Sequence, residues 1–125
     1  MGGNFIVDLE RDPQHPQVLW AAGREHLFKT LDGGATWFEI SGGIPRDPFV
    51  TTFFTDLAFD PRNGGILYAA TQNRGIFRSQ NGGDTWEPIN AGLPLLDVRV
   101  LEVDPGTPGG LFAGTGGTGI WAGRF

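Results

Sequence analysis

Short stretches of alternating hydrophobic and polar residues recur along this chain, each bounded by glycine, proline, asparagine or aspartate. Three of them end in an Asp-Pro pair and read FIVDLERDP, FTDLAFDP and VRVLEVDP. Three more follow the turn after each pair and read VLWAAG, ILYAAT and GLFAGT. Alternation of this length, with many β-branched and aromatic residues, is typical of half-buried β-strands. No window has apolar residues at helical spacing, so the pattern predicts an all-β chain.

The strand-like stretches return in a fixed order, which identifies a repeat protein. A third stretch reads HLFKT, GIFRS and GIWAG, and a fourth, present twice, reads ATWFEI and DTWEPI. The Asp-Pro pairs are 48 and then 44 residues apart. Four antiparallel strands per repeat of this length predict β-propeller blades, about two and three-quarters in this chain. We expect one domain, 1–125, with blade 1 at about 4–45, blade 2 at about 52–94 and a partial blade 3 at about 97–125.

A nine-residue stretch, KTLDGGATW, ends at Trp37 and returns 49 residues later as RSQNGGDTW, which ends at Trp86. Its Gly-Gly turn needs positive φ angles, which glycine adopts without steric cost. Asp32 and Asn81 each have a short side-chain oxygen that can accept backbone N–H groups of the same turn. We expect a hairpin in each repeat, with its tryptophan buried between neighbouring blades.

These two stretches resemble the Asp-box of BNR-repeat propellers, written S/T-x-D-x-G-x-T-W. The strands before them resemble the version found in sortilin-type domains, photosystem II assembly factors and xyloglucanases. The resemblance covers nearly the whole chain, and it departs from the family at Asn81 and in having no third box. It implies that the box is a structural hairpin on the face away from the usual ligand site. The matching residues are Thr30, Asp32, Gly34, Thr36, Trp37, Ser79, Asn81, Gly83, Thr85 and Trp86.

Composition narrows the classes of partner and site. The formal charge of −5 and the scattered basic residues argue against binding to nucleic acid or an anionic membrane. The absence of cysteine excludes disulfides and thiolate metal sites, and we expect no cofactor and no metal. The first residues show no signal-peptide pattern, although the family resemblance leans towards an exported protein.

Closed propellers typically have 4 to 8 blades, which is more than this sequence predicts. An open arc would expose apolar blade faces at both ends. We therefore expect the chain to self-associate into a closed ring, as a dimer in preference to a trimer, because two-fold symmetry is the commonest. The competing interpretation is that the chain is the C-terminal part of a longer propeller. The uneven repeat spacing argues against a fully idealised designed protein.

In a propeller built this way, the turns between strands two and three share one face with the linkers between blades. We expect this face to surround a central mouth that binds a small polar or carbohydrate ligand. Ordinary solvated loops are the competing interpretation. The side chains predicted at the mouth are Arg24, Glu25, His26, Gln72, Asn73 and Arg74, with Arg46 and Asp47 from a linker.

Asp8 and Asp56 occupy equivalent positions in the first strands of two blades, which should line the central channel, and both are also candidate ligand-binding residues. Paired carboxylates about 5–9.5 Å apart can hydrolyse glycosides, so the alternative function is part of a glycoside hydrolase-like, carbohydrate-active enzyme. Val100 holds the third equivalent position, and repetition of a residue favours a structural cause. The one tyrosine, Tyr68, aligns with core aromatics, which argues against a sialidase. The sequence favours a non-enzymatic scaffold or binding module.

Overall fold

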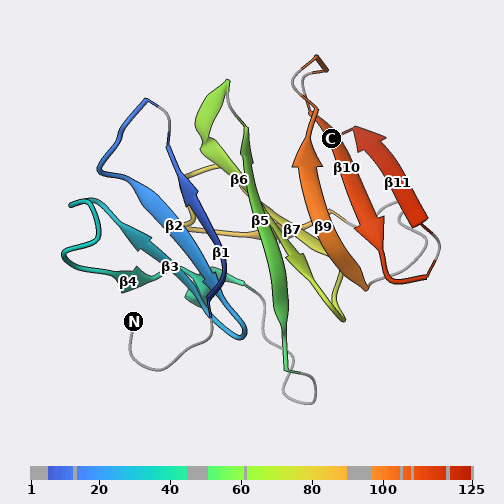
Figure 1. Ribbon diagram of the computed structural model, residues 1–125, viewed down its shortest axis with the longest axis horizontal. Helices are drawn as coiled ribbons and strands as arrows, with labels where there is room; N and C mark the ends of the chain where they lie inside the picture. The colour runs from blue at the N-terminus through green and yellow to red at the C-terminus, as the bar shows by residue number, and fades with distance from the viewer. Residues whose placement is uncertain are drawn as a thin grey trace.

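A computed structural model describes residues 6–12, 14–44, 51–60, 62–89, 97–104, 106–107, 109–117 and 119–124. In these residues three antiparallel sheets stand side by side in an open arc (Figure 1). The described part has no α-helix, and therefore no helix long and apolar enough to cross a membrane. The predicted all-β fold with four-stranded antiparallel blades is confirmed.

Within each sheet the strands follow one another in chain order, as in a meander. Blade 1 consists of β1 (Ile6–Arg11), β2 (Leu19–Gly23), β3 (Leu27–Thr30) and β4 (Phe38–Glu39), followed by the 3₁₀ turn η1 (Ser41–Gly43). Blade 2 consists of β5 (Phe54–Asp60), β6 (Asn63–Thr71), β7 (Ile76–Ser79) and β8 (Glu87–Pro88). Blade 3 consists of β9 (Val98–Val103), β10 (Gly110–Thr115) and β11 (Gly119–Arg124).

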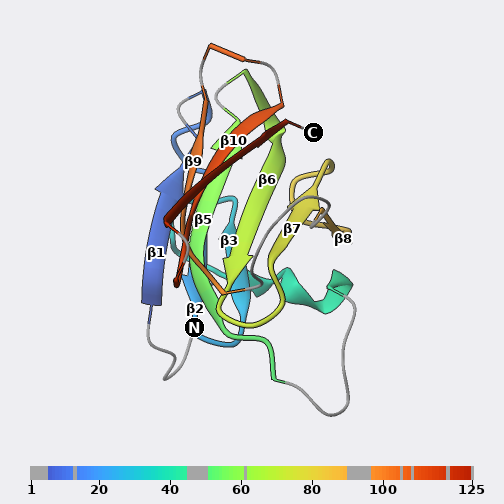
Figure 2. The same ribbon diagram turned by 90° about the vertical axis from the view of Figure 1, so that its right-hand side faces the viewer.

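The first strands of the three blades, β1, β5 and β9, are neighbours along the inner side of the arc. Figure 2 views the arc from its end, with these inner strands on one side and β7 and β8 on the other. Side chains on each strand alternate between two faces, so every blade offers one face to the preceding blade and the other to the following blade.

The hydrophobic core lies in the two gaps between blades. In the first gap, Trp20, Leu27 and Ile40 of blade 1 contact a cluster from blade 2 that includes Phe77 and Trp86. In the second gap, the opposite face of blade 2 meets blade 3. The buried residues there are Ala58, Tyr68, Ala70, Ile76, Ile89, Val98, Leu101, Leu111 and Ala113. The core therefore belongs to pairs of blades, and each blade needs a neighbour to bury its faces.

The two hairpin tryptophans differ in burial. Trp86 is 6% exposed, and its Nε1 donates to the carbonyl of Ile40 in blade 1 at 3.0 Å and to that of Gly83 at 3.1 Å. Trp37 is partly exposed, because no sheet among the described residues lies on the outer side of blade 1. Full burial is confirmed for Trp86, and the same expectation is wrong for Trp37.

The second glycine of each Gly-Gly turn shows the same contrast. Gly34 (φ 100°) and Gly83 (φ 104°) are strained positions for any other residue, but only at Gly83 would a Cβ meet the preceding blade, 2.7 Å from Ile40 Cδ1. We expect Gly83→Ala to lower the free energy of unfolding by about 1–2 kcal/mol more than Gly34→Ala. Urea unfolding followed by tryptophan fluorescence measures both. Equal costs would mean that Ile40 moves aside freely.

Candidate functional site

The polar groups of the blade 1 hairpin are used inside the turn. The Thr30 hydroxyl accepts the Gly34 N–H at 3.0 Å and donates to Asp32 at 2.7 Å. The Asp32 carboxylate accepts both the N–H of Thr36, at 2.8 Å, and its hydroxyl. These bonds, led by that from the Thr36 side chain, lower the pKa of Asp32 to about 2. The ionised aspartate therefore holds the turn closed.

The blade 2 hairpin has the same network with an amide in place of the carboxylate. Asn81 Oδ1 accepts the Ser79 hydroxyl at 2.9 Å and the Thr85 N–H at 2.9 Å. Its Nδ2 donates to the Thr85 hydroxyl at 2.8 Å, so this hydroxyl accepts where that of Thr36 donates. The departure from the acidic residue thus keeps the shape of the turn.

The predicted mouth lies at the opposite end of the sheets from these hairpins, where the turns between the second and third strands meet the segment 51–54. The Arg24 carbonyl accepts the Phe54 N–H at 2.7 Å, and the Arg24 guanidinium lies over the Phe53 ring, 5.4 Å from its centroid. Gln72 donates its N–H to the Phe53 carbonyl at 2.8 Å. Two neighbouring turns thus hold the segment that enters blade 2.

Asn73 and Arg74 hold the same segment through their side chains. Asn73 Oδ1 accepts the Phe53 N–H at 3.4 Å, and Arg74 Nη1 donates to the Thr52 hydroxyl at 2.8 Å. The structure therefore brings together Arg24, Gln72, Asn73 and Arg74, four of the eight predicted mouth residues.

The other predicted mouth residues differ in position. His26 Nδ1 is 3.0 Å from Glu39 Oε2 and turns towards β4, while Glu25 is exposed. Arg46 and Asp47 lie outside the described residues. Ligand binding at the mouth stays a prediction.

Asp8 and Asp56 tie each blade to the next. Asp8 Oδ2 accepts the Leu57 N–H of blade 2 at 3.0 Å, and Asp56 Oδ2 accepts the Leu101 N–H of blade 3 at 2.7 Å. The second oxygen of each carboxylate accepts the N–H of the next residue in its own strand, Leu9 or Leu57. We call these two contacts the carboxylate bridges. Each bridge satisfies backbone donors on two inner strands at once.

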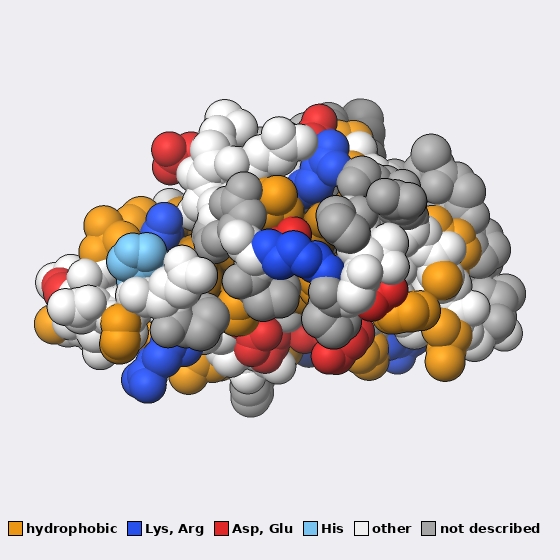
Figure 3. All heavy atoms as spheres, turned by 90° about the horizontal axis from the view of Figure 1, so that it is seen from above, with side chains coloured by type: hydrophobic (Ala, Val, Ile, Leu, Met, Phe, Trp, Pro, Cys, Tyr) orange, Lys and Arg blue, Asp and Glu red, His pale blue; other side chains and the backbone are white. Residues whose placement is uncertain are grey.

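A row of four acidic side chains, Asp8, Glu10, Asp56 and Glu102, follows the inner strands, and acidic side chains gather on that side of the molecule in Figure 3. Burial, followed by the charges of the other three, raises the pKa of Glu10 to about 7. Burial, followed by a hydrogen bond with Asp8, raises the pKa of Asp56 to about 7. Glu10 and Asp56 therefore hold protons near neutral pH.

The Asp8 and Asp56 carboxylates share one donor, because the Leu57 N–H lies 3.0 Å from both Asp8 Oδ2 and Asp56 Oδ1. Their other two oxygens accept the N–H groups of Leu9 and Leu101. Glycoside hydrolysis instead needs carboxyl groups that face a sugar or a water molecule. The geometry therefore gives this pair a structural task. In the part of the chain that is described, no group of three or more histidine or carboxylate side chains could hold a metal ion.

The sequence analysis missed Glu10 and Glu102. Glu10 is two residues from Asp8 in an alternating strand, so both project from one face, and this spacing was a usable signal. Glu102 holds the equivalent position in blade 3, but Ala58 interrupts the series in blade 2. A glutamate therefore holds this position in blades 1 and 3, the two blades that are not adjacent.

No family model matches the sequence, and no curated protein matches it. Several solved structures resemble the whole chain. YCF48 from Cyanidioschyzon merolae matches 95% of it with a TM-score of 0.68 at 20% identity. YCF48 bound to D1 peptide matches 96% with a TM-score of 0.71 at 21% identity.

Two further structures come from larger proteins. The GH74 xyloglucanase from Xanthomonas campestris matches 97% of this chain with a TM-score of 0.70 at 20% identity. The extracellular domain of a putative hybrid two-component system from B. thetaiotaomicron matches 100% with a TM-score of 0.75 at 18% identity. This chain spans 34% and 38% of the two YCF48 chains, and 21% and 18% of the other two. All four are β-propellers, and the chain is therefore a segment with the β-propeller fold.

Proposed function

We propose that this chain is a non-enzymatic propeller scaffold or binding module that self-associates head to tail into a closed ring. The observation that carries the proposal is the exposure of positions that are buried in the other blades. Trp20 and Leu27 are 1% and 0% exposed in blade 1, and Tyr68 and Ile76 are 2% and 0% exposed in blade 2. The equivalent residues of blade 3 are exposed instead, Phe112 to 42% and Ile120 to 81%.

The outer face of blade 1 shows the complementary pattern. In blade 2, Phe54 and Leu57 are 3% and 2% exposed, because blade 1 covers them. The equivalent residues of blade 1, Ile6 and Leu9, are 41% and 52% exposed. Each end of the arc thus presents the kind of apolar face that an adjoining blade covers inside the arc. Exposed apolar patches of this kind mark interaction sites.

A second copy of the chain is the occupant that we propose for both faces. The outer face of blade 3 has apolar residues at the positions by which blades 1 and 2 contact the blade that follows them. The outer face of blade 1 has apolar residues at the positions by which blade 2 contacts the blade before it. Head-to-tail contact of two copies would place about six blades in the ring, within the usual range of 4 to 8. Three copies, with eight or nine blades, are the alternative. The competing proposal is that further blades of a longer chain cover the two faces.

We also propose that the two hairpins are Asp-boxes of the BNR-repeat type, which fits the internal hydrogen bonds of both turns. For the mouth we propose a small polar or carbohydrate ligand, supported by the exposed side chains of Arg24 and Gln72. The alternative, part of a glycoside hydrolase-like enzyme, has support in the likeness to a GH74 xyloglucanase. The backbone N–H groups that Asp8 and Asp56 already accept argue against catalysis by this pair.

Molar mass in solution tests the ring. By light scattering after size exclusion we expect about twice the 13.5 kDa of one chain. Ile120→Glu places a charge on the outer face of blade 3 and is expected to give a monomer. Ile120 is 81% exposed in one chain, so the variant still folds.

Leu31→Glu is the matched control. Leu31 is 59% exposed, and its equivalent in blade 2, Gln80, stays exposed although blade 2 has neighbours on both sides. The proposal therefore predicts that Leu31→Glu leaves the doubled mass unchanged. A wild-type mass of one chain at every concentration tested would overturn self-association.

A further inference from the structure

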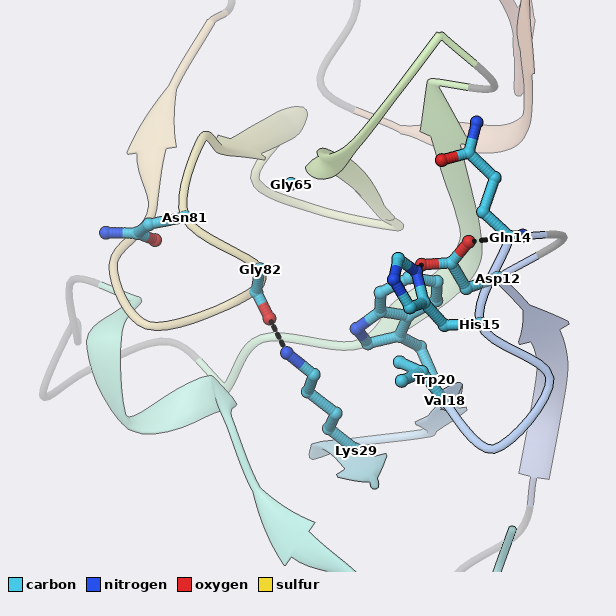
Figure 4. Close-up of a pocket in the computed structure, with 9 residues that line it drawn as sticks. All are labelled: Asp12, Gln14, His15, Val18, Trp20, Lys29, Gly65, Asn81 and Gly82. Atoms are coloured by element: carbon cyan, nitrogen blue, oxygen red, sulfur yellow. Dashed lines mark hydrogen bonds and ion pairs between the residues drawn. The ribbon is translucent and has the colours of Figure 1, made fainter. Parts of the chain in front are cut away.

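A pocket of about 490 Å³ lies at the junction of blades 1 and 2, at the end of the sheets opposite the predicted mouth (Figure 4). One wall is the turn between β1 and β2, with Asp12 and His15. The facing wall is the blade 2 hairpin at Gly82, and Trp20 and Lys29 lie between the walls. None of these residues contributes to the proposed ring contacts or to the mouth.

Trp20 brings an unused hydrogen-bond donor to this pocket. Its side chain is 1% exposed, and among the described residues Nε1 is the one buried side-chain nitrogen or oxygen without a hydrogen-bond partner. In Figure 4 the indole nitrogen lies on the side of the ring that faces Lys29 and Gly82. A buried N–H without an acceptor is unfavourable, so the site favours an occupant that supplies one.

Lys29 brings a cation to the same place. Its Nζ lies 5.9 Å from the centroid of the Trp20 ring and donates to the Gly82 carbonyl at 3.1 Å. In the described part of the chain no carboxylate forms an ion pair with Lys29. An ammonium group has three donors, so its hydrogen-bonding capacity exceeds this one contact.

Comparison with blade 2 shows what blade 1 lacks. Arg78, the equivalent of Lys29, pairs with Glu87 on the next strand, with Nη2 and Oε1 2.6 Å apart. Phe38 holds the position of Glu87 in blade 1, and it cannot pair with a cation through a carboxylate. Lys29 therefore turns to the neutral carbonyl of Gly82, across the gap between the blades.

The carboxylate of the pocket, Asp12, already has hydrogen-bond partners within its own turn. Asp12 is 6% exposed, Oδ1 accepts the Gln14 N–H at 2.9 Å, and Oδ2 is 3.1 Å from His15 Nδ1. The pocket therefore has two hydrogen-bond donors that gain no acceptor from Asp12, the neutral Trp20 N–H and the cationic Lys29 ammonium group. Its occupant should offer two acceptor oxygens and a single negative charge, because a dianion would face one lysine and a nearby aspartate.

We propose that this pocket binds a small carboxylate anion, with one oxygen accepting from Trp20 Nε1 and the other from Lys29 Nζ. Acetate is the probe, because it presents this group with little else attached. The four tryptophan indole N–H resonances of the ¹⁵N-labelled chain report on binding site by site. We expect the Trp20 resonance to shift and saturate with sodium acetate, while the Trp86 resonance stays in place. Trp20→Phe assigns the signal, and Trp37→Phe, Trp86→Phe and Trp121→Phe assign it by elimination.

Variants separate the proposed contact from general charge effects. Lys29→Met is expected to weaken acetate binding about tenfold or more, because it removes a charge-assisted hydrogen bond. Lys29→Gln, which keeps an N–H donor without the charge, should give an intermediate affinity. Arg99→Met is the control, since it makes the same change in net charge at an exposed Asp97 pair outside the pocket, and it should bind as wild type does.

Sodium chloride, sodium phosphate and glycerol complete the titration at equal ionic strength. Stronger binding of phosphate or glycerol than of acetate would overturn the carboxylate assignment. No acetate-dependent shift at Trp20, or an affinity unchanged in Lys29→Met, would overturn the site. A Trp20 resonance that shows a contact with bound water and ignores acetate would show that water fills the pocket, and it would also overturn the proposal.

Discussion

Replacing Trp86 with alanine is expected to lower the free energy of unfolding by about 3–5 kcal/mol, the range for removing a fully buried tryptophan. The side chain is 6% exposed, and it lies among the residues that join blades 1 and 2. Its Nε1 donates to the carbonyl of Ile40, a residue 46 positions earlier in the chain. The substitution therefore removes both apolar contact and a hydrogen bond from the gap between the blades.

Trp37→Ala is the internal comparison for this prediction. Trp37 has the same place in its hairpin but is partly exposed on the outer side of blade 1, so we expect a cost of about 1–2 kcal/mol in dilute protein. Urea unfolding followed by circular dichroism measures both variants without relying on the residue removed. Equal costs in dilute protein would contradict the burial of Trp86 by the preceding blade.

The same pair also reports on the proposed ring. If a second copy covers the outer side of blade 1, Trp37 is covered with it. The cost of Trp37→Ala should then rise with protein concentration, while that of Trp86→Ala should not.

The free energy of unfolding is expected to fall by about 2 kcal/mol between pH 5 and pH 8 because of the acidic row. Glu10 and Asp56 have pKa values of about 7 in the folded chain, against ordinary values of 4.5 and 3.8. The folded state binds these protons more tightly, so their stabilisation is present below about pH 4 and is lost as the pH rises through about 7. The expected size is well below the full linkage value, because both groups are partly exposed and screened by solvent.

Asp32 acts in the opposite direction at lower pH. Its pKa is lowered to about 2 by the Thr36 hydroxyl and the other bonds of the turn. The contribution of its ionised form is present above about pH 4 and is lost as the pH falls towards 2. The two effects together predict maximum stability near pH 4.

Urea unfolding at constant ionic strength across this pH range measures the effect. Glu10→Gln removes one member of the acidic row, so it should be about as stable as wild type at pH 5 and more stable at pH 8. Glu25→Gln removes a carboxylate from an exposed turn and should leave the pH profile unchanged. A wild-type chain that is equally stable at pH 5 and pH 8 would contradict the prediction.

Much of the fold could be predicted because each strand carries its own signals. The alternation before each Asp-Pro pair, the Gly-Gly turns and the repeat spacing gave the strands, their order and their pairing. Burial could not be predicted to the same degree, because it depends on what lies beside a blade. Trp37 and Trp86 sit in nearly identical sequences, and the difference between them is the presence of a preceding blade.

The candidate sites were less accessible to sequence reasoning. The placement of Arg24 and Arg74 near the linker followed from topology, but their partners, the Phe53 ring and the Thr52 hydroxyl, depend on the fold. The pocket at Trp20 and Lys29 gave no signal, because its walls come from separate repeats. The sequence shows that blade 1 has Phe38 where blade 2 has Glu87. That this difference leaves Lys29 without a carboxylate partner follows only from the ion pair between Arg78 and Glu87 in the structure.

The carboxylate bridges bear on how such an array can change its length over evolution. Each bridge runs from one repeat to the repeat that follows, and blade 2 has both halves, the Asp56 carboxylate and the Leu57 N–H. A duplicated copy of blade 2 would therefore join its parent through the contact that already exists. Blade 3 has Val100 in place of the aspartate, so a copy of blade 3 would arrive without this contact. Blade 1 has the same two groups in Asp8 and the Leu9 N–H, so a copy of blade 1 or of blade 2 carries this contact with it and a copy of blade 3 does not.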